Sequence, residues 1–257
     1  MIASLVWKGA MAAVVLTGLA VVPAEAQSCT NERFEDARYL VCTVDPATAD
    51  LQLFWRDENG EPYRTFDRLA SDAAGDGRRL LFAMNAGMYR TDFSPVGLHV
   101  ENGTELRPAN TTVIDAAPSQ VPNFYKKPNG IFFLANGDAG ILPTDEYLAS
   151  RPEARFATQS GPMLVIRNEL HPAFIRGSSD RARRSGVGIC ESGAVRFAIS
   201  DGRVNFDEFA RLFRDHLACP DALFLDGGRG AGVYVPEERR NDRSWHGGFG
   251  PMLGLVQ

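Results

Sequence analysis

The fold is decided by residues 194–228, which read AVRFAISDGRVNFDEFARLFRDHLACPDALFLDGG. Apolar and polar residues alternate over 194–200, which predicts a half-buried strand. Asn205, with a glutamate three positions on, matches a helix N-cap, and apolar residues then recur at helical spacing over 206–217. The apolar run 222–225 predicts a buried strand. Strand, helix and strand in this order indicate a crossover connection.

In the rest of the sequence, the same signals predict many strands and few helices. Residues 38–56 are expected to form a strand pair around the turn Asp45-Pro46, and the apolar run 79–84 a buried strand. Further strands are expected at 96–101, 130–135, 155–158, 162–167 and 186–190. We therefore predict an α+β fold, in which a mixed β-sheet core is flanked by a few helices within a single domain.

The N-terminus has the features of a signal peptide. Lys8 precedes an apolar run over 10–22, and Ala24-Glu25-Ala26 provides a small-x-small cleavage site. We predict that residues 1–26 are removed and that residues 27–257 form the domain, which is periplasmic or secreted. An uncleaved anchor helix is the alternative, but Pro23 follows the apolar run too closely to favour it, so no stable membrane insertion is expected after cleavage.

Charge and cysteine content restrict the possible partners further. The net charge is −5, which does not favour nucleic acid or an anionic membrane surface as a partner. Four cysteines in an oxidising compartment indicate two disulfides, with three possible pairings. We favour Cys29–Cys42 and Cys190–Cys219. Zinc binding is less favoured because the four histidines are scattered along the chain.

Five predicted strands lead into or out of short segments that contain glycine. Glycine permits a positive φ or a close approach of the backbone to a ligand, so such segments can present polar side chains. Each segment alone is an ordinary turn signal, but five together indicate a ligand site. The segments are MNAGMY (84–89), KPNGIFF (127–133), ATQSGPMLV (157–165), RRSGVGI (183–189) and FLDGGRG (224–230).

These segments, with SPVGLHVENG (94–103) and HPAF (171–174), form an ordered set over about residues 80–230 that resembles the phosphodiester glycosidase family. The resemblance implies hydrolysis of the bond between the anomeric carbon and the phosphate of a sugar-1-phosphodiester. Export would direct the activity to envelope or exopolysaccharide-type carbohydrate. The chemistry requires no cofactor, and metal dependence is left open.

The resemblance also assigns residues to roles. A departing phosphate monoester is a weak base, with a second pKa of about 6, so neutralising its charge can replace protonation. The family motifs supply a carboxylate, Asp226, as nucleophile or as the base that activates water, and a guanidinium, Arg184, as the phosphate clamp. The residues expected to bind substrate are Asn85, Asn129, Gln159, Ser160, Gly227, Gly228 and, as a second carboxylate, Asp201, although Asp-Gly is equally a hairpin turn signal.

One position departs from the family pattern. Where mammalian members continue the motif with serine, Arg229 follows Asp226-Gly227-Gly228 here. This cation either binds an additional anionic group or points to solvent. The mammalian substrate is therefore not carried over to this chain.

Three other functions fit the sequence less well. In a serine hydrolase Ser160 would be the nucleophile, but its surroundings lack the Gly-x-Ser-x-Gly elbow. A non-catalytic glycan-binding or envelope-binding module would use the aromatic segment SWHGGFGPM (244–252), in which Trp245, His246 and Phe249 form a sugar platform. Metal-assisted hydrolysis would draw on carboxylates that no signature fixes in spacing, namely Asp92, Asp201 and Asp226.

Overall fold

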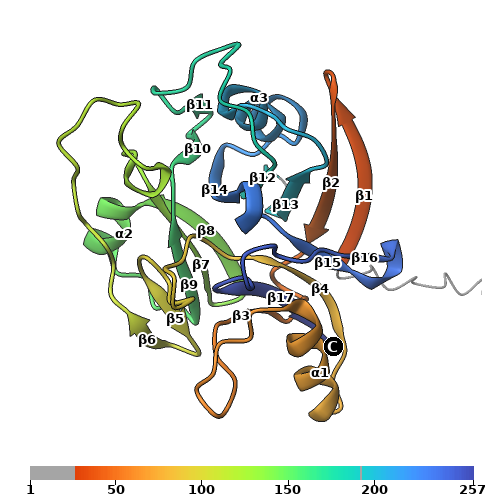
Figure 1. Cartoon of the computed structure of the whole chain (residues 1–257). Coiled ribbons are helices and arrows are strands. Elements are labelled where there is room, and N and C mark those ends of the chain that lie inside the picture. The colour runs from red at the N-terminus through yellow and green to blue at the C-terminus, as the bar shows by residue number, and fades with distance from the viewer. Residues whose placement is uncertain (1–26, 192) are drawn as a thin grey trace, which may run out of the picture.

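A computed structural model describes residues 27–191 and 193–257. The predicted signal peptide, residues 1–26, lies outside the described residues. Three β-sheets pack together, with short helices at their margins (Figure 1). Within the described ranges the pairs of named strands all run antiparallel, so the sheets are antiparallel rather than mixed.

The largest sheet carries the crossover expected from residues 194–228. Its strands, in spatial order, are β1 (Gln27–Phe34), β2 (Ala37–Val44), β13 (Val195–Ser200), β12 (Arg184–Ile189), β14 (Asp221–Gly227), β10 (Met163–Ile166) and β11 (Glu169–Leu170). The crossover strands β13 and β14 run in the same direction, but β12 lies between them and is antiparallel to both. The expected strand, helix and strand are therefore correct, although the two strands are not neighbours.

Two five-stranded sheets complete the fold. One has the order β16 (Arg240–Asn241), β15 (Val233–Val235), β4 (Leu80–Asn85), β17 (Met252–Val256) and β3 (Leu51–Phe54). The other has the order β6 (Thr104–Arg107), β5 (His99–Glu101), β9 (Phe156–Ser160), β7 (Gly130–Ala135) and β8 (Asp138–Pro143). The expectation of a strand pair within 38–56 is wrong in its pairing, because β2 and β3 belong to different sheets.

The helix at 206 begins as the sequence predicts. The backbone N–H of Glu208 donates to Asn205 Oδ1 at 2.9 Å, and Glu208 Oε2 accepts from the Asn205 N–H at 3.1 Å, which completes the capping box. The helix α3 (Phe206–Arg211) continues into one π turn, η2 (Leu212–His216). The other helices are α1 (Phe66–Gly75) and α2 (Thr144–Ser150), with single turns η1 (Asn123–Tyr125), η3 (Gly228–Gly230) and η4 (Pro236–Glu238).

Two glycines of RRSGVGI allow this helical segment to lie directly on β12. A Cβ at Gly186 would lie 3.1 Å from the ring of Phe209, and one at Gly188 would lie 2.7 Å from the ring of Phe213. Both phenylalanines are fully buried. These glycines therefore serve helix packing and not the approach of a ligand.

A substitution at Gly188 tests this packing. We expect Gly188→Ala to lower the free energy of unfolding by about 1–3 kcal/mol, because the added methyl group overlaps Phe213 and the Cys219 sulfur in a close-packed layer. Chemical denaturation measures the change. Gly202→Ala is the matched control, since no atom lies within 4 Å of its added Cβ. Equal stability of the two variants would contradict this role of Gly188.

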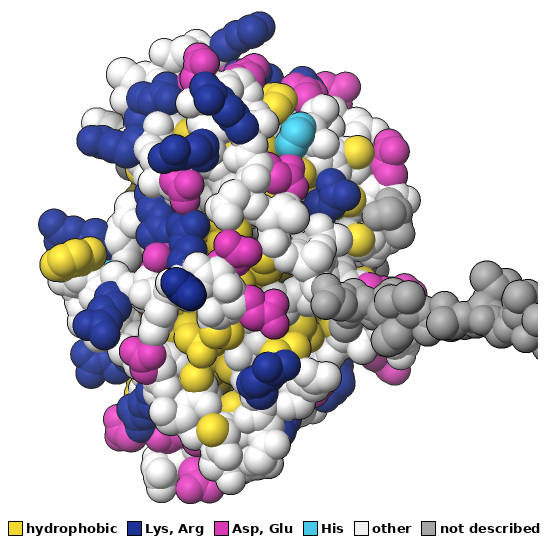
Figure 2. Space-filling view, turned by 90° about the vertical axis from the view of Figure 1, so that its right-hand side faces the viewer, with side chains coloured by type: hydrophobic (Ala, Val, Ile, Leu, Met, Phe, Trp, Pro, Cys, Tyr) yellow, Lys and Arg dark blue, Asp and Glu magenta, His cyan; other side chains and the backbone are white. Residues whose placement is uncertain are grey.

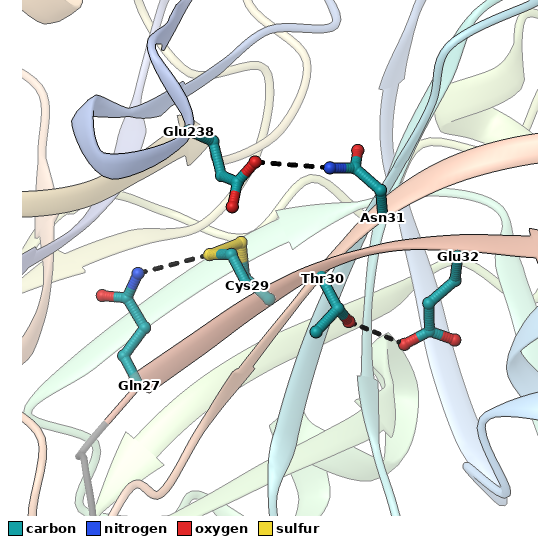
Figure 3. Close-up of a disulfide and its surroundings, with 7 residues drawn as sticks. Gln27, Cys29, Thr30, Asn31, Glu32 and Glu238 are labelled. Atoms are coloured by element: carbon teal, nitrogen blue, oxygen red, sulfur yellow. Dashed lines mark hydrogen bonds between the residues drawn. A yellow bond between two sulfur atoms is a disulfide. The ribbon is translucent and has the colours of Figure 1, made fainter.

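Both favoured disulfides are present. Cys29–Cys42 joins β1 to β2, and Cys190–Cys219 joins the end of β12 to the chain after η2. Beside the first, Gln27 Nε2 donates to the Cys29 sulfur and Asn31 donates to Glu238, which fastens β1 to η4 (Figure 3). Disulfides of this kind are typical of proteins from oxidising compartments. In the part of the chain that the structure describes, no helix is long and apolar enough to cross a membrane.

Candidate active site

A cleft of about 820 Å³ opens where β14 ends. Four segments that are distant in the sequence form it, and each belongs to or adjoins a glycine-bearing motif. The lining residues are Met88, Tyr89, Arg90, Thr91, Phe93, Val96, Pro122, Phe124, Tyr125, Asp226, Gly227, Arg229, Gly230 and His246. Of the predicted site residues, the structure brings Asp226 and Gly227 to this cleft.

Asp226 is partly buried in the cleft wall. The Gly227 N–H donates to its Oδ1 at 2.7 Å, and the carboxylate lies so close to Gly230 that a Cβ there would overlap it. Burial raises the pKa of Asp226 from 3.8 to about 7, although the hydrogen bond from Gly227 lowers it. A carboxyl group with a pKa near neutrality can accept a proton from water and return it.

Another part of the cleft lining holds a hydrogen-bond chain. The Tyr89 hydroxyl donates to the Gly248 carbonyl at 2.8 Å and lies 2.9 Å from His246 Nε2. Because a phenol has one hydrogen, which goes to the Gly248 carbonyl, Nε2 donates to Tyr89. His246 Nδ1 lies 2.6 Å from the Ser244 hydroxyl and accepts from it when the imidazole is neutral. The charge of Asp226 and burial both raise the pKa of Tyr89, with burial the larger cause. Tyr89 is therefore a fixed, neutral wall of the cleft.

Two arginines in the cleft lining have no ion pair. Arg90 and Arg229 are exposed, and neither forms a salt bridge within residues 27–191 and 193–257. Asp226 is the one carboxylate among the lining residues. The cleft thus combines one carboxyl group with two cations that are free to bind an anion.

Arg184 lies on the other side of the β12–β14 ladder, where it is 2% exposed. Its guanidinium donates to the Val204 carbonyl at 2.9 Å and the Asp180 carbonyl at 3.1 Å, and it lies 3.6 Å from the centre of the Phe206 ring. Burial lowers its pKa to about 10. Arg184 does not line the cleft, so the surroundings do not support the direct phosphate contact that the resemblance implies.

The predicted amide and hydroxyl ligands are buried and bond to the protein. Asn129 donates to the Phe124 carbonyl at 3.0 Å, and Ser160 donates to the Leu225 carbonyl at 2.9 Å. The side-chain oxygen of Gln159 accepts from the backbone of Leu98 and Asn110, and that of Asn85 accepts from the Gly232 N–H. These residues hold the cleft walls in place, and they do not line the cleft themselves.

Asp201 takes part in ion pairs rather than in the cleft. It lies 3.0 Å from Arg240 and 3.9 Å from Arg38. On the face formed by β1, β2 and β16, basic and acidic side chains lie side by side, in keeping with such pairs (Figure 2). The role of a second catalytic carboxylate is therefore not supported for Asp201.

A neighbouring ion pair fixes the loop after Asp226. Arg183 pairs with Asp242 at 2.5 Å, donates to the Ala231 carbonyl at 3.3 Å, and accepts from the Gly228 N–H through its own carbonyl. Gly228 has a φ of 58°, a conformation that glycine adopts readily. Gly228 thus shapes the loop that presents Arg229.

The structure gives less support to a serine hydrolase, to an aromatic sugar platform and to metal-assisted hydrolysis than to the cleft around Asp226. Ser160 is completely buried and its hydroxyl donates to a carbonyl, so it is not placed as a nucleophile. Phe249 is buried against Phe66, with ring centres 4.7 Å apart, whereas Trp245 is 90% exposed. In the described part of the chain, no group of three or more His, Cys, Asp or Glu side chains gathers as metal ligands.

Several residues of the cleft were not singled out by the sequence, among them Tyr89, Arg90 and Tyr125. Tyr89 belongs to the motif MNAGMY, and Arg90 follows it directly. The glycine motifs therefore pointed to the right loops. They did not indicate which side chain of each loop faces the cleft.

A cleft that holds one raised-pKa carboxyl group and unpaired arginines is typical of a site for anionic substrates. A family model described as phosphodiester glycosidase matches residues 78–250. The uncharacterized protein YigE of Escherichia coli (strain K12) is 34% identical over 185 residues, which are 72% of this chain and 70% of that protein. The chain belongs to the phosphodiester glycosidase family.

Solved structures share the fold at 14% sequence identity. The catalytic domain of zebrafish N-acetylglucosamine-1-phosphodiester α-N-acetylglucosaminidase has a TM-score of 0.63, with 91% of this chain and 84% of that one covered. A hypothetical protein from Synechocystis has a TM-score of 0.52 (89% and 61% covered). A putative exported protein from Burkholderia pseudomallei K96243 has a TM-score of 0.51 (85% and 74% covered). At this identity the likeness shows the fold alone.

Proposed function

We propose that the protein is an exported hydrolase that cleaves the glycosidic bond of sugar-1-phosphodiesters in envelope or exopolysaccharide-type carbohydrate. The observation that carries the proposal is the pairing in one cleft of a half-buried carboxyl group, Asp226, with arginines that have no ion pair. Membership of the phosphodiester glycosidase family supports the reaction class. The two disulfides support a location outside the cytoplasm.

In the proposed reaction, water is added across the bond between the anomeric carbon and the phosphate oxygen. The C–O bond breaks, and its electron pair leaves with the phosphate oxygen. The hydroxyl of water ends on the sugar, and its proton passes to the phosphate monoester or to solvent. Asp226, in its ionised form, either attacks the anomeric carbon or takes the proton from the attacking water.

Arg229 replaces Arg184 as the proposed phosphate contact. Arg229 lines the same cleft as Asp226 and follows it by three residues, on a loop fixed by Arg183. A guanidinium can form two parallel hydrogen bonds to phosphate and offset the charge that develops on the leaving group. Arg184 already donates to carbonyl groups of the protein. We assign it the role of holding the first residue of β12 against the start of α3.

Release of free sugar tests the proposal. The purified mature protein is incubated with methyl phosphodiesters of glucose 1-phosphate and N-acetylglucosamine 1-phosphate, in both anomeric forms, and with the corresponding uridine diphosphate sugars. We expect free sugar, together with a phosphate monoester or a nucleotide, from at least one of these compounds. The Asp226→Asn variant should release the sugar far more slowly. Binding of these compounds without turnover would instead favour the non-catalytic glycan-binding alternative.

A further inference from the structure

The second unpaired arginine, Arg90, sits on a rigid turn at the cleft. Its N–H donates to the Ser94 carbonyl at 2.8 Å, and its carbonyl accepts from the Phe93 N–H at 2.9 Å. The flanking rings of Tyr89 and Phe93 stack with centres 5.8 Å apart. Two backbone hydrogen bonds of Arg90 thus hold the turn that carries its side chain at the cleft.

The neighbouring carboxylate does not neutralise Arg90. Asp92 Oδ1 accepts from the Ser94 N–H at 3.0 Å and from the Ser94 hydroxyl at 2.7 Å. These hydrogen bonds lower the pKa of Asp92, so it is ionised, but it is not among the residues that line the cleft. The nearby Arg64 has its guanidinium 4.4 Å from the centre of the Phe93 ring, which adds positive charge on this side. The turn therefore carries a cation, Arg90, that forms no ion pair with the carboxylate beside it in the described part of the chain.

The cleft also has room for more than one substrate unit. Its volume of about 820 Å³ lies in the upper part of the usual range for ligand clefts, about 300–1,000 Å³. Four of its lining residues carry Phe or Tyr rings: Tyr89 and Phe93 stack on each other, and Phe124 and Tyr125 meet edge to face with ring centres 5.1 Å apart. Aromatic faces suit the apolar faces of sugar rings or a base between two charged positions.

We infer that Arg90 forms a second anion subsite, which binds a further phosphate on the leaving-group side of the scissile phosphodiester. The inference rests on the proposed function of the same cleft. Arg229 binds the phosphate that is attacked, and Arg90 binds the next one. The substrate class is a sugar 1-phosphate whose phosphate carries a second phosphate, either directly as a diphosphate or one unit further along a sugar-phosphate chain.

The test compares substrates that share one sugar and differ in the second phosphate. The first probe is a methyl phosphodiester of the sugar 1-phosphate, and the second is the uridine diphosphate sugar. The third is a synthetic chain in which one phosphodiester joins two sugars and a second phosphodiester ends the chain. For the wild-type protein and the Arg90→Gln variant, kcat and KM are measured with each. Arg151→Gln is the control, since Arg151 is exposed and lines a different groove.

We expect Arg90→Gln to raise KM about tenfold for a probe with two phosphates, since one charge-assisted contact is lost, and to leave the methyl phosphodiester within twofold. The probe whose KM rises identifies where the second phosphate lies in the substrate, either in a diphosphate or further along a sugar-phosphate chain. An equal loss on all three probes would overturn the inference, because Arg90 would then act on the part they share. If the wild-type protein releases sugar from none of them, the proposed function itself fails.

Discussion

Asp226→Asn is expected to lower kcat by about 10³-fold while leaving the protein folded, because it removes the nucleophile or base and keeps an oxygen to accept from the Gly227 N–H. The wild-type kcat/KM should rise with pH up to about 7 and then level off as far as Asp226 is concerned. The reason is that only the ionised carboxylate acts, and burial raises its pKa to about 7. The pH dependence of sugar release measures both effects.

The same substitution should stabilise the protein at alkaline pH. Between pH 3.8 and about 7 the folded state holds a proton on Asp226 that the unfolded state has lost, so stability falls as pH rises through this window. A rise of about three pKa units corresponds to about 4 kcal/mol, which we halve to about 2 kcal/mol because the side chain is only partly buried. Asp226→Asn should therefore melt several degrees higher than the wild type at pH 8, with little difference at pH 4.

These two effects separate catalysis from folding. If the variant is inactive yet more stable than the wild type at pH 8, Asp226 is needed for activity although its ionised form destabilises the folded protein. If Asp226→Asn remained active, the catalytic assignment of Asp226 would be wrong. A lower melting temperature of this variant at pH 8 would contradict the raised pKa of Asp226.

Arg229→Gln should lower kcat/KM by about 10²-fold with the melting temperature unchanged, because the side chain is exposed and contacts phosphate only in the complex. Arg229→Lys keeps the charge but loses the two-pronged geometry, so part of the activity should return. Steady-state kinetics with one phosphodiester, together with thermal melts, measures the two variants.

Arg184→Gln is the matched comparison and should behave in the opposite way. It leaves the Val204 and Asp180 carbonyls without their donors and removes the stack on Phe206, so the free energy of unfolding should fall by about 1–3 kcal/mol. The folded fraction should keep its activity within a few-fold. A folded Arg184→Gln protein that had lost activity, beside an active Arg229→Gln, would place the phosphate contact at Arg184 after all.

Local signals in the sequence predicted the fold's elements well, and the pairing of strands less well. The strand expected over 194–200 and the capping box at Asn205 depend on neighbouring residues, and both are found in the structure. The alternation also predicted that the strand is half-buried, which is wrong, because β13 lies inside a sheet that is covered on both faces. Which strands lie side by side depends on contacts between distant segments. The position of β12 between β13 and β14 therefore could not be inferred from the order of elements.

The candidate site was predicted at the level of loops, and only partly at the level of side chains. Glycine signals a special backbone or a close approach, but Gly188 meets a helix and Gly230 meets a carboxylate, and the sequence does not distinguish the two. Asn129 and Ser160 donate to buried carbonyl groups, and a buried carbonyl needs such a donor whether or not a ligand is near. Arg229 was noticed because it departs from the family pattern, and the structure places it in the cleft.

In the proposed reaction the bond that breaks lies between the anomeric carbon and oxygen, and not between oxygen and phosphorus. Hydrolysis in water enriched in ¹⁸O tests this directly, with mass analysis of the phosphate monoester that is released. Cleavage at carbon leaves the original oxygen on phosphorus, so we expect a phosphate monoester without label. A phosphate that carries one ¹⁸O per turnover would show attack at phosphorus and would contradict the glycosidase function.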